Sequence, residues 1–242
     1  SNLINTYERI VKMMYGNEDY MLMQRDPNRL VKLIVAVCFT VLLAVSVGFN
    51  FDYLQFLDSI FTTAVQGSAP TQGLEHFYGM VTFLASPKMD IFWVFIAAFF
   101  LWGFKYKVPA LWALFTIGGG DVIGAIVKQL VRRHRPPLHL GVDNGYSFPS
   151  GHVLGFFLVA GILWVIVIPL IQHASIRFIV KALLVVVLIC VMFSRIYLNA
   201  HYPTDTVGAC LVGYSWLLIS EMLYASYAPQ VARYRFVVNT KI

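Results

Sequence analysis

The sequence is poor in charged residues: Asp, Glu, Lys and Arg make up 12% of its 242 positions, whereas 59% are hydrophobic. Together with a mean hydropathy of +0.71, this scarcity excludes an ordinary soluble domain and indicates a bilayer protein. Six apolar runs are candidate spans, most of them near the roughly 20 residues that a bilayer core requires. They cover residues 31–49, 89–104, 108–127, 153–171, 181–198 and 206–220.

Lipid offers no hydrogen-bond partners to the backbone, so segments of this length are expected to be helices. We therefore predict an all-α fold, an integral membrane bundle of six transmembrane helices. The second, fifth and sixth runs are short, which leaves five spans as an alternative. The chain has no internal repeat, low-complexity tract or long linker, so residues 1–242 are predicted to form one membrane-embedded domain.

Cysteine is also scarce: Cys38, Cys190 and Cys210 are the three in the chain, and no two of them have C-x2-C spacing. This excludes a disulfide framework and a cysteine metal site. All three fall inside predicted spans, where we expect small buried apolar residues. Residues 1–29 are too polar for a secretory signal.

The net charge of +6 does not point to nucleic acid, because the basic residues follow the predicted topology instead of forming one patch. Twelve of the eighteen Lys and Arg lie on one predicted side, which the positive-inside bias assigns to the cytoplasm. Both termini, including segment 1–29, are then cytoplasmic, and the other side of the cell membrane is extracytoplasmic. The twelve are Arg9, Lys12, Arg25, Arg29, Lys32, Lys105, Lys107, Arg177, Lys181, Arg233, Arg235 and Lys241.

Residues 51–85, between the first two spans, are predicted to form short amphipathic helices on the outer side. Two roles are equally compatible with them: guiding a lipid headgroup, or covering the end of the bundle. A turn signal at 67–70 separates the two helices. The apolar positions are Leu54, Leu57, Phe61 and Val65, then Leu74, Phe77, Tyr78 and Val81; residues expected on other faces include Asp52, Gln55, Asp58 and Thr62.

The first motif, K-x6-R-P, closes the third span. Lys128 and Arg135 are seven residues apart, so they are expected to stack on one helix face together with Arg132. Pro136 and Pro137 are expected to end the helix. The alternative is that these cations only reach lipid headgroups.

Asp121 also falls on that face, seven residues before Lys128. It either offsets the charge of the lysine or makes a structural contact near the glycines 118–120, and the structural contact is favoured. Ionisable residues within spans are otherwise candidates for function.

The second motif, P-S-G-H at 149–152, stands at the start of the fourth span, next to a short loop after the first motif. Ser150 is expected to cap the helix. Exposed N–H groups at a helix start hold anions, and Gly151 allows a phosphate to approach the backbone. Taken alone, His152 would be an ordinary neighbour of a cap.

The third motif, S-R-x5-H-x3-D, runs from Ser194 to Asp205. Asp205 falls in the first turn of the sixth span, where it can reach back to His201 and leave one ring nitrogen free as a nucleophile. The alternative is a capping Asp205 and a loop-filling His201. His76, His134, His139 and His173 lack such a partner in the sequence and are expected to face solvent or the interface.

The three motifs in this order resemble the signature of the type 2 phosphatidic acid phosphatase superfamily, the lipid phosphate phosphatases. The resemblance covers 128–205 closely, and six spans with both termini inside extend it to most of the chain. Within the superfamily, the chain is most similar to bacterial membrane phosphatases of the phosphatidylglycerophosphate phosphatase B and undecaprenyl pyrophosphate phosphatase type.

The resemblance implies that His201 attacks phosphorus and becomes phosphohistidine, that Asp205 orients it, and that His152 is the general acid and base. It also implies that a group of residues binds the phosphate oxygens, with no metal and no cofactor. Independently, metal-assisted phosphatases cluster carboxylates, whereas only Asp205 belongs to the motifs. The phosphate-binding group comprises Lys128, Arg135, Ser150, Gly151 and Arg195.

The expected partners are the bilayer and a lipid phosphate substrate whose headgroup lies at the extracytoplasmic surface. Phosphatidylglycerophosphate, undecaprenyl pyrophosphate, phosphatidic acid and diacylglycerol pyrophosphate all fit, and the sequence defines no oligomeric state. Rival functions are a phosphotransferase using the same intermediate, a lipid-headgroup binding or transport protein, and a vanadate-dependent haloperoxidase, whose relatives are soluble.

Overall fold

The computed structural model describes residues 22–23, 26–67, 71–137, 145–237 and 240–242. Its α-helices are α2 (Arg29–Gly48), α3 (Asp52–Gln66), α4 (Gln72–Leu84), α5 (Pro87–Gly103), α6 (Lys107–Val131), α7 (Gly151–Ile162), α8 (Ala174–Tyr197) and α9 (Pro203–Val231). Helix α7 continues through a π-helical turn, η2 (Leu163–Val167), and a 3-10 turn, η3 (Ile168–Leu170); η4 (Arg235–Val237) follows α9.

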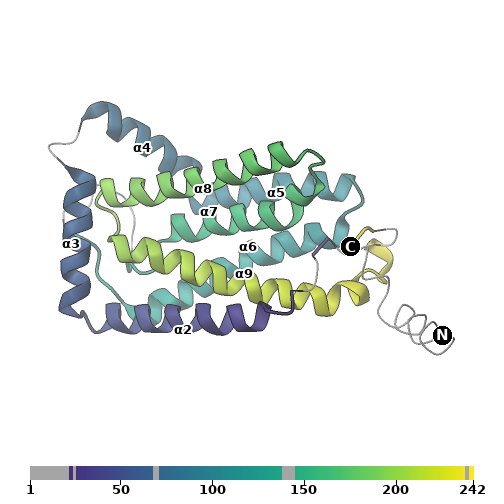
Figure 1. Cartoon of the computed structure of the whole chain (residues 1–242), viewed down its shortest axis with the longest axis horizontal. Helices are drawn as coiled ribbons and strands as arrows, with labels where there is room; N and C mark the ends of the chain where they lie inside the picture. Colours follow the sequence, from purple (N-terminus) through teal and green to yellow (C-terminus); the bar gives the residue numbers. More distant parts are fainter. Residues whose placement is uncertain (1–21, 24–25, 68–70, 138–144, 238–239) are drawn as a thin grey trace.

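Six of these helices, α2 and α5 to α9, run side by side along the long axis of the molecule (Figure 1). Among the described residues, five segments are long and apolar enough to cross a membrane, with α7 and its continuation as one of them. Counted as one span, the bent pair of α4 and α5, whose axes differ by 52°, is a sixth. The predicted all-α transmembrane bundle is therefore confirmed, and the short second run corresponds to α5.

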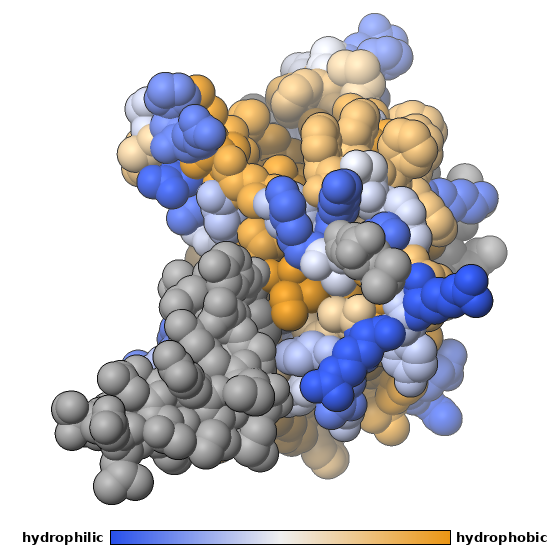
Figure 2. Space-filling model, turned by 90° about the vertical axis from the view of Figure 1, so that its right-hand side faces the viewer, coloured by the Kyte–Doolittle hydropathy of each residue, from blue (hydrophilic) through white to orange (hydrophobic). Residues whose placement is uncertain are grey.

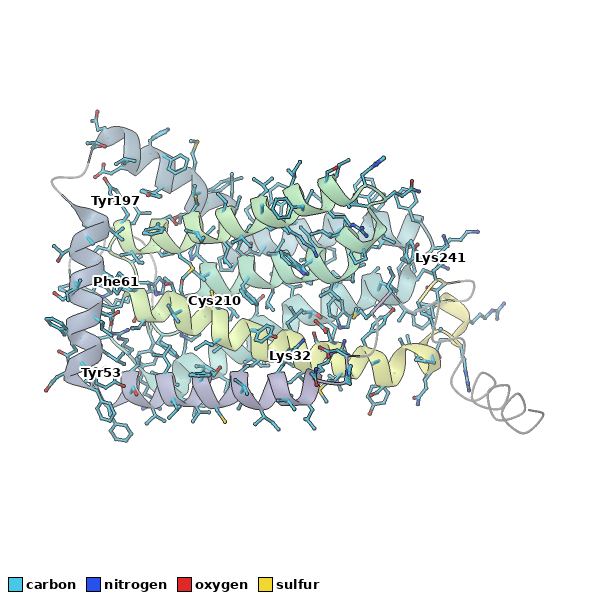
Figure 3. The ribbon with its side chains drawn as sticks, viewed as in Figure 1. Lys32, Tyr53, Phe61, Tyr197, Cys210 and Lys241 are labelled. Carbon is cyan, nitrogen blue, oxygen red and sulfur yellow. The ribbon has the colours of Figure 1, made fainter. Side chains whose placement is uncertain are left out.

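Helix α3 crosses one end of the bundle, called the α3 end below (Figure 1). Helices α6 and α8 finish at this end, and α7 and α9 begin there. All three sequence motifs lie at these helix ends, so the alternating direction of the helices alone gathers them. Tyr53, Phe61 and Tyr197 mark the α3 end in Figure 3, and Lys241 lies at the opposite end.

Close helix packing explains Gly119 and Gly120, whereas a Cβ atom at Gly118 would meet nothing within 4 Å. A Cβ atom at Gly119 would lie 2.2 Å from the Trp216 side chain, and one at Gly120 would lie 2.0 Å from Leu158. Glycine is therefore needed for α6 to approach α7 and α9. This gives the region around Asp121 a packing role, while the role of the carboxylate itself stays a prediction.

The outer surfaces of α2 and α8 are apolar, as expected for helices that face lipid. Phe39 of α2 is 58% exposed and Phe178 of α8 is 73% exposed. Cys38 lies on the exposed surface of α2, so its predicted burial was wrong; Cys190 and Cys210 are half-buried. All three cysteines are free thiols.

Both amphipathic segments between the first two spans are helical, α3 and α4, as predicted. Asp58 was expected on another face than the apolar positions of α3, but it is buried together with Leu54, at 2% exposed. Leu57 and Phe61 are exposed. The turn signal at 67–70 is described only at Gly67, whose φ of +54° favours glycine.

The end opposite α3 holds the described parts of both chain ends, where the Leu22 N–H donates to the carbonyl of Ile242. Figure 2 shows this end, with hydrophilic side chains gathered on it and apolar side chains around them. The expected cytoplasmic segment 1–29 lies largely outside the described residues.

Candidate active site

Helix α6 ends at Val131 because Arg132 adopts the left-handed conformation, with φ at +53°. The predicted stacking of Lys128 and Arg135 on one helix face was therefore wrong, as was helix termination by the prolines. The Arg132 side chain is exposed and donates from Nε to the Gln129 carbonyl of its own helix. Arg135 belongs to the non-helical segment that follows α6.

Hydrogen bonds connect the two cations of the first motif to the residues before α7 and to the third motif. Lys128 donates to the Tyr146 carbonyl at 2.8 Å, just before α7. Arg135 donates from Nη1 to the Ala200 carbonyl at 2.9 Å, between α8 and α9. The two cations thus reach the site by different routes: Lys128 from the last turn of α6 and Arg135 from the segment beyond it.

The start of α7 offers several groups that a phosphate requires. Ser150 occupies the N-cap position but makes no capping hydrogen bond through its side chain. Its Oγ is fully buried and has no hydrogen-bond partner among the described residues. A Cβ atom at Gly151 would meet only Pro87, at 3.9 Å, so the space beside the helix start is open.

One backbone contact brings Asp205 against this helix start, and another holds His201 at the end of α8. The Ser150 N–H donates to the Asp205 carbonyl at 3.1 Å, and the His201 N–H donates to the Arg195 carbonyl at 3.2 Å. His152 follows Gly151 in the first turn of α7 and is half-buried. The second and third motifs are therefore adjacent, as their positions at helix ends predicted.

His201 is 2% exposed and lies between an acid and a cation. Its Nδ1 is 3.5 Å from Oδ2 of Asp205, and its Nε2 is 3.2 Å from Nη1 of Arg135. Arginine is only a donor, so this geometry assigns the lone pair to Nε2 and the ring proton to Nδ1, facing the carboxylate. Nε2 is thus the nitrogen available for attack.

The pKa of His201 is lowered to about 4, mainly by burial; Asp205 acts in the opposite direction, and Arg195 and Arg135 add to the lowering. At neutral pH the ring is therefore neutral, with one ring proton. A nucleophile or base needs this form, whereas a buried imidazolium would not have a free lone pair.

Asp205 is held by more than His201. Its Oδ2 accepts from the Ser147 hydroxyl at 2.8 Å and from the Tyr202 N–H at 2.9 Å. Its Oδ1 accepts from Arg133 Nη1 at 2.7 Å. A carboxylate with partners on both oxygens keeps one orientation.

Arg133 is the residue that the motif pattern missed. It is one of the six positions that K-x6-R-P leaves unspecified, yet its guanidinium bridges Asp205 and Asp58, the latter at 2.6 Å. It also stacks over the Tyr202 ring, 4.0 Å from the centroid. Burial lowers the pKa of Arg133, but Asp205 and Asp58 outweigh this and raise it overall.

Arg195 comes from the last turn of α8 and is 3% exposed. Its Nη1 is 3.5 Å from the Thr82 hydroxyl of α4, and Thr82 also donates to Ser194 at 3.2 Å. Helix α4 therefore contributes a wall to the site. His76, His134 and His173 are exposed as predicted, and His139 lies outside the described residues.

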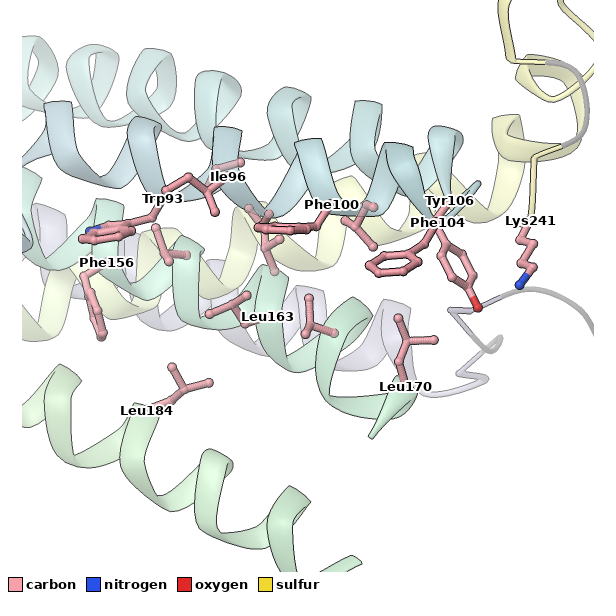
Figure 4. A pocket seen from close by; sticks show the side chains of 16 residues that line it. Trp93, Ile96, Phe100, Phe104, Tyr106, Phe156, Leu163, Leu170, Leu184 and Lys241 are labelled. Carbon is pink, nitrogen blue, oxygen red and sulfur yellow. The ribbon is translucent and has the colours of Figure 1, made fainter. Parts of the chain in front are cut away.

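An apolar groove with a cavity volume of about 880 Å³ runs between α5, α7 with its continuation, and α8. Side chains such as Phe100, Leu163 and Leu170 line it (Figure 4). On α7, Phe156 lies four residues after His152, so both occupy one helix face. The groove therefore starts about one turn below the site and continues towards Lys241 at the opposite end.

Comparison with known proteins agrees with the motif pattern. Residues 109–227 match the model of the PAP2 superfamily. Phosphatidylglycerophosphatase B of Bacillus subtilis is 27% identical over 132 residues, 50% of this chain and 59% of that protein, so the alignment spans less than two thirds of this relative. Undecaprenyl-diphosphatase of Sulfolobus acidocaldarius is 24% identical over 158 residues, 62% of this chain and 72% of that protein.

Two solved structures share the fold. The crystal structure of a transmembrane PAP2-type phosphatidylglycerolphosphate phosphatase from Bacillus subtilis has a TM-score of 0.67 at 22% identity, covering 84% of this chain and 99% of that chain. The crystal structure of Aquifex aeolicus LpxE has a TM-score of 0.51 at 23% identity, covering 68% and 94%. At these identities the likeness concerns the fold.

Proposed function

The chain carries a PAP2 superfamily domain, and from this membership we propose that it is an integral membrane lipid phosphatase that works through a phosphohistidine on His201. The observation that carries the proposal is the geometry of His201: a buried, neutral ring with Nδ1 facing Asp205 and Nε2 beside Arg135. A protein that only bound headgroups would not need an oriented nucleophile.

In the first step, Nε2 of His201 forms a bond to phosphorus while the bond from phosphorus to the lipid oxygen breaks. His152 protonates the departing oxygen. In the second step, His152 takes a proton from water, the water oxygen attacks phosphorus, and the bond to His201 breaks. General acid and base help of this kind is worth about 100- to 10,000-fold.

The cations stabilise the charge that collects on the three equatorial oxygens of the transferred phosphoryl group. We assign this role to Lys128, Arg135 and Arg195, with the Ser150 hydroxyl and the Gly151 N–H. Because these groups supply the positive field, the reaction requires no metal.

The groove favours a substrate with a long chain. From Phe156 to Leu170 it follows α7 for about 20 Å at 1.5 Å per residue, whereas one leaflet of a bilayer core is about 15 Å thick. Phosphatidylglycerophosphate and undecaprenyl pyrophosphate are the two main candidates, and the second has the tail that fills such a depth. Phosphatidic acid remains a third candidate.

The basic residues that flank the helices at the end opposite α3, such as Lys105 and Arg177, support an orientation with that end in the cytoplasm. The site at the α3 end is then extracytoplasmic, in the cell membrane, and both termini are cytoplasmic.

The test is phosphate release by purified protein in mixed micelles with EDTA, comparing phosphatidylglycerophosphate and undecaprenyl pyrophosphate, with His201→Ala beside the wild type. We expect release that the variant abolishes, and a 32P-labelled substrate should leave acid-labile label on the wild type only. Equal release by the variant, or loss of turnover in EDTA that magnesium restores, would contradict the proposal.

Product analysis in the same assay addresses the nearest rival. Transfer of labelled phosphate to an added lipid alcohol, without free phosphate, would identify a phosphotransferase. Binding of the lipid without either product would identify a headgroup-binding protein.

A further inference from the structure

Asp58 lies outside the three motifs and Arg133 is at one of the unspecified positions of the first, yet they form a continuous chain of contacts to His201. Oδ2 of Asp58 is 2.6 Å from Nη2 of Arg133, and Nη1 of Arg133 is 2.7 Å from Oδ1 of Asp205. Oδ2 of Asp205 in turn faces His201 at 3.5 Å. Asp58 also lies outside the stretch that matches the PAP2 superfamily model.

Thr204, in the first turn of α9, is hydrogen-bonded to both Asp58 and Arg133. Its N–H donates to Oδ1 of Asp58 at 2.9 Å, and its hydroxyl donates to Oδ2 of the same residue at 2.8 Å. The Thr204 hydroxyl also accepts from Arg133 at 2.8 Å. Asp58 therefore binds both the guanidinium and the helix that carries Asp205.

All of these groups are buried, so their charges act with little screening by solvent. The side chains of Asp58 and Asp205 are 3% and 0% exposed, and that of Arg133 is 9% exposed. The charged groups that act on His201 are Asp205, Arg195 and Arg135. Arg133 neutralises part of the charge of the first of these, and Asp58 in turn offsets Arg133.

We infer that Asp58 and Arg133 are positioning residues: they hold the Asp205 carboxylate in the orientation that His201 needs and set how much of the negative charge of Asp205 acts on the imidazole. The inference rests on the proposed role of His201 as nucleophile. It gives α3 a role in the reaction beyond covering the end of the bundle.

The effect of charge on His201 can be separated from the effect of geometry, because removal of Arg133 and removal of Asp58 change the local charge in opposite directions. Arg133→Gln leaves Asp205 uncompensated, so the pKa of His201 should rise by about one unit. Asp58→Asn should not raise it, and the double variant should return it towards the wild-type value. A purely structural role predicts no such reversal.

Arg133→Lys tests the geometric part. Lysine keeps the positive charge but cannot bridge two carboxylates with a planar fork. We expect a pKa of His201 near that of the wild type and a kcat reduced about 100-fold, as for a reacting group that is slightly misplaced.

The experiment is an NMR titration of histidine-labelled full-length protein in detergent micelles, with His201 assigned by the signal lost in His201→Gln, together with pH profiles of kcat/KM. Matched controls are Arg132→Gln, at the adjacent exposed arginine, and Asp52→Asn, at an exposed acid of α3. Both should leave the His201 titration and kcat unchanged.

The inference would be overturned if the pKa of His201 were the same in Arg133→Gln and Arg132→Gln, or if Arg133→Lys kept the kcat of the wild type. If Arg133→Gln fails to fold, Arg133→Lys and Asp58→Asn still decide between the outcomes. The titration does not depend on turnover, so an inactive wild type would contradict the proposed function while the positioning role remained measurable.

Discussion

The α3 end and the groove between α5, α7 and α8 are built on opposite principles. At the α3 end, Asp205 accepts hydrogen bonds on both oxygens, Arg133 binds Asp205, and Arg135 lies beside His201. In the groove, the lining is apolar apart from the amino group of Lys241 and the hydroxyl of Tyr106. The polar end is preorganised for a phosphate, whereas the groove constrains only length and shape of a chain.

This difference implies that the chemical step and the choice of lipid can be altered separately. Substitutions at the α3 end should lower turnover for every substrate. Substitutions in the groove should change the ratio between long-chain and short-chain substrates.

The largest effect is expected from Asp205→Asn. An amide keeps the shape but loses the charge that holds the proton of His201 on Nδ1, so kcat should fall about 1,000-fold. The measurement is kcat with a short-chain lipid phosphate. Glu221→Gln makes the same chemical change in the same helix, at the ion pair with Arg29, and should keep kcat within a few-fold.

Turnover of Asp205→Asn within tenfold of the wild type would show that the carboxylate does not orient His201. Size-exclusion chromatography of both variants separates this outcome from misfolding.

An intermediate effect is expected from Gly151→Ala. The new methyl group meets only Pro87, at 3.9 Å, so the helix should form normally, but the methyl group occupies the space where the phosphate approaches the backbone. We expect kcat/KM to fall about 30-fold, less than the roughly 100- to 1,000-fold that removal of one oxyanion donor costs. Gly73→Ala in α4, with nothing within 4 Å, is the control.

Unchanged kcat/KM in Gly151→Ala, with an unchanged melting temperature, would place the phosphate elsewhere than the start of α7. A loss of stability instead of activity would show that the space beside Gly151 is not open.

The smallest effect is expected in the groove, from Ala97→Trp. The indole would fill part of the cavity next to Phe100 and Leu101, so kcat/KM for undecaprenyl pyrophosphate should fall about tenfold. A short-chain lipid phosphate should be hydrolysed at the wild-type rate. Ala125→Trp, at an exposed position of α6, controls for an added indole in the membrane.

An equal loss for long and short chains would mean that Ala97→Trp disturbs the site itself. No loss for either would exclude the groove as the place of the tail.

Much of the site followed from local sequence rules. Apolar runs predicted the helices, and alternation of their directions placed 128–136, 149–152 and 194–205 at one end of the bundle. The spacing of His201 and Asp205 across the start of α9 predicted their contact, because three residues and a helix start bring the carboxylate back to the ring. These are relations within one helix or between successive helices, which a periodic backbone determines.

Local rules failed where the chain left its periodic path. Arg132 adopts a left-handed conformation, so counting helical turns from Lys128 gave the wrong place for Arg135. The same count could not single out Arg133 among the residues of K-x6-R-P. The amphipathic pattern of α3 placed Asp58 on another face than the apolar positions, whereas it is buried beside Leu54.

The sequence by itself thus determined the membrane bundle, the helix directions and the residues that meet at the α3 end, since hydropathy and helix geometry act locally. Only the tertiary structure decided that Asp58 reaches Arg133 and that Arg133 reaches Asp205, contacts between residues 75 and 72 positions apart. A buried charged group needs an oppositely charged partner. The tertiary fold determines which partner lies near it, and the spacing of residues in the sequence does not.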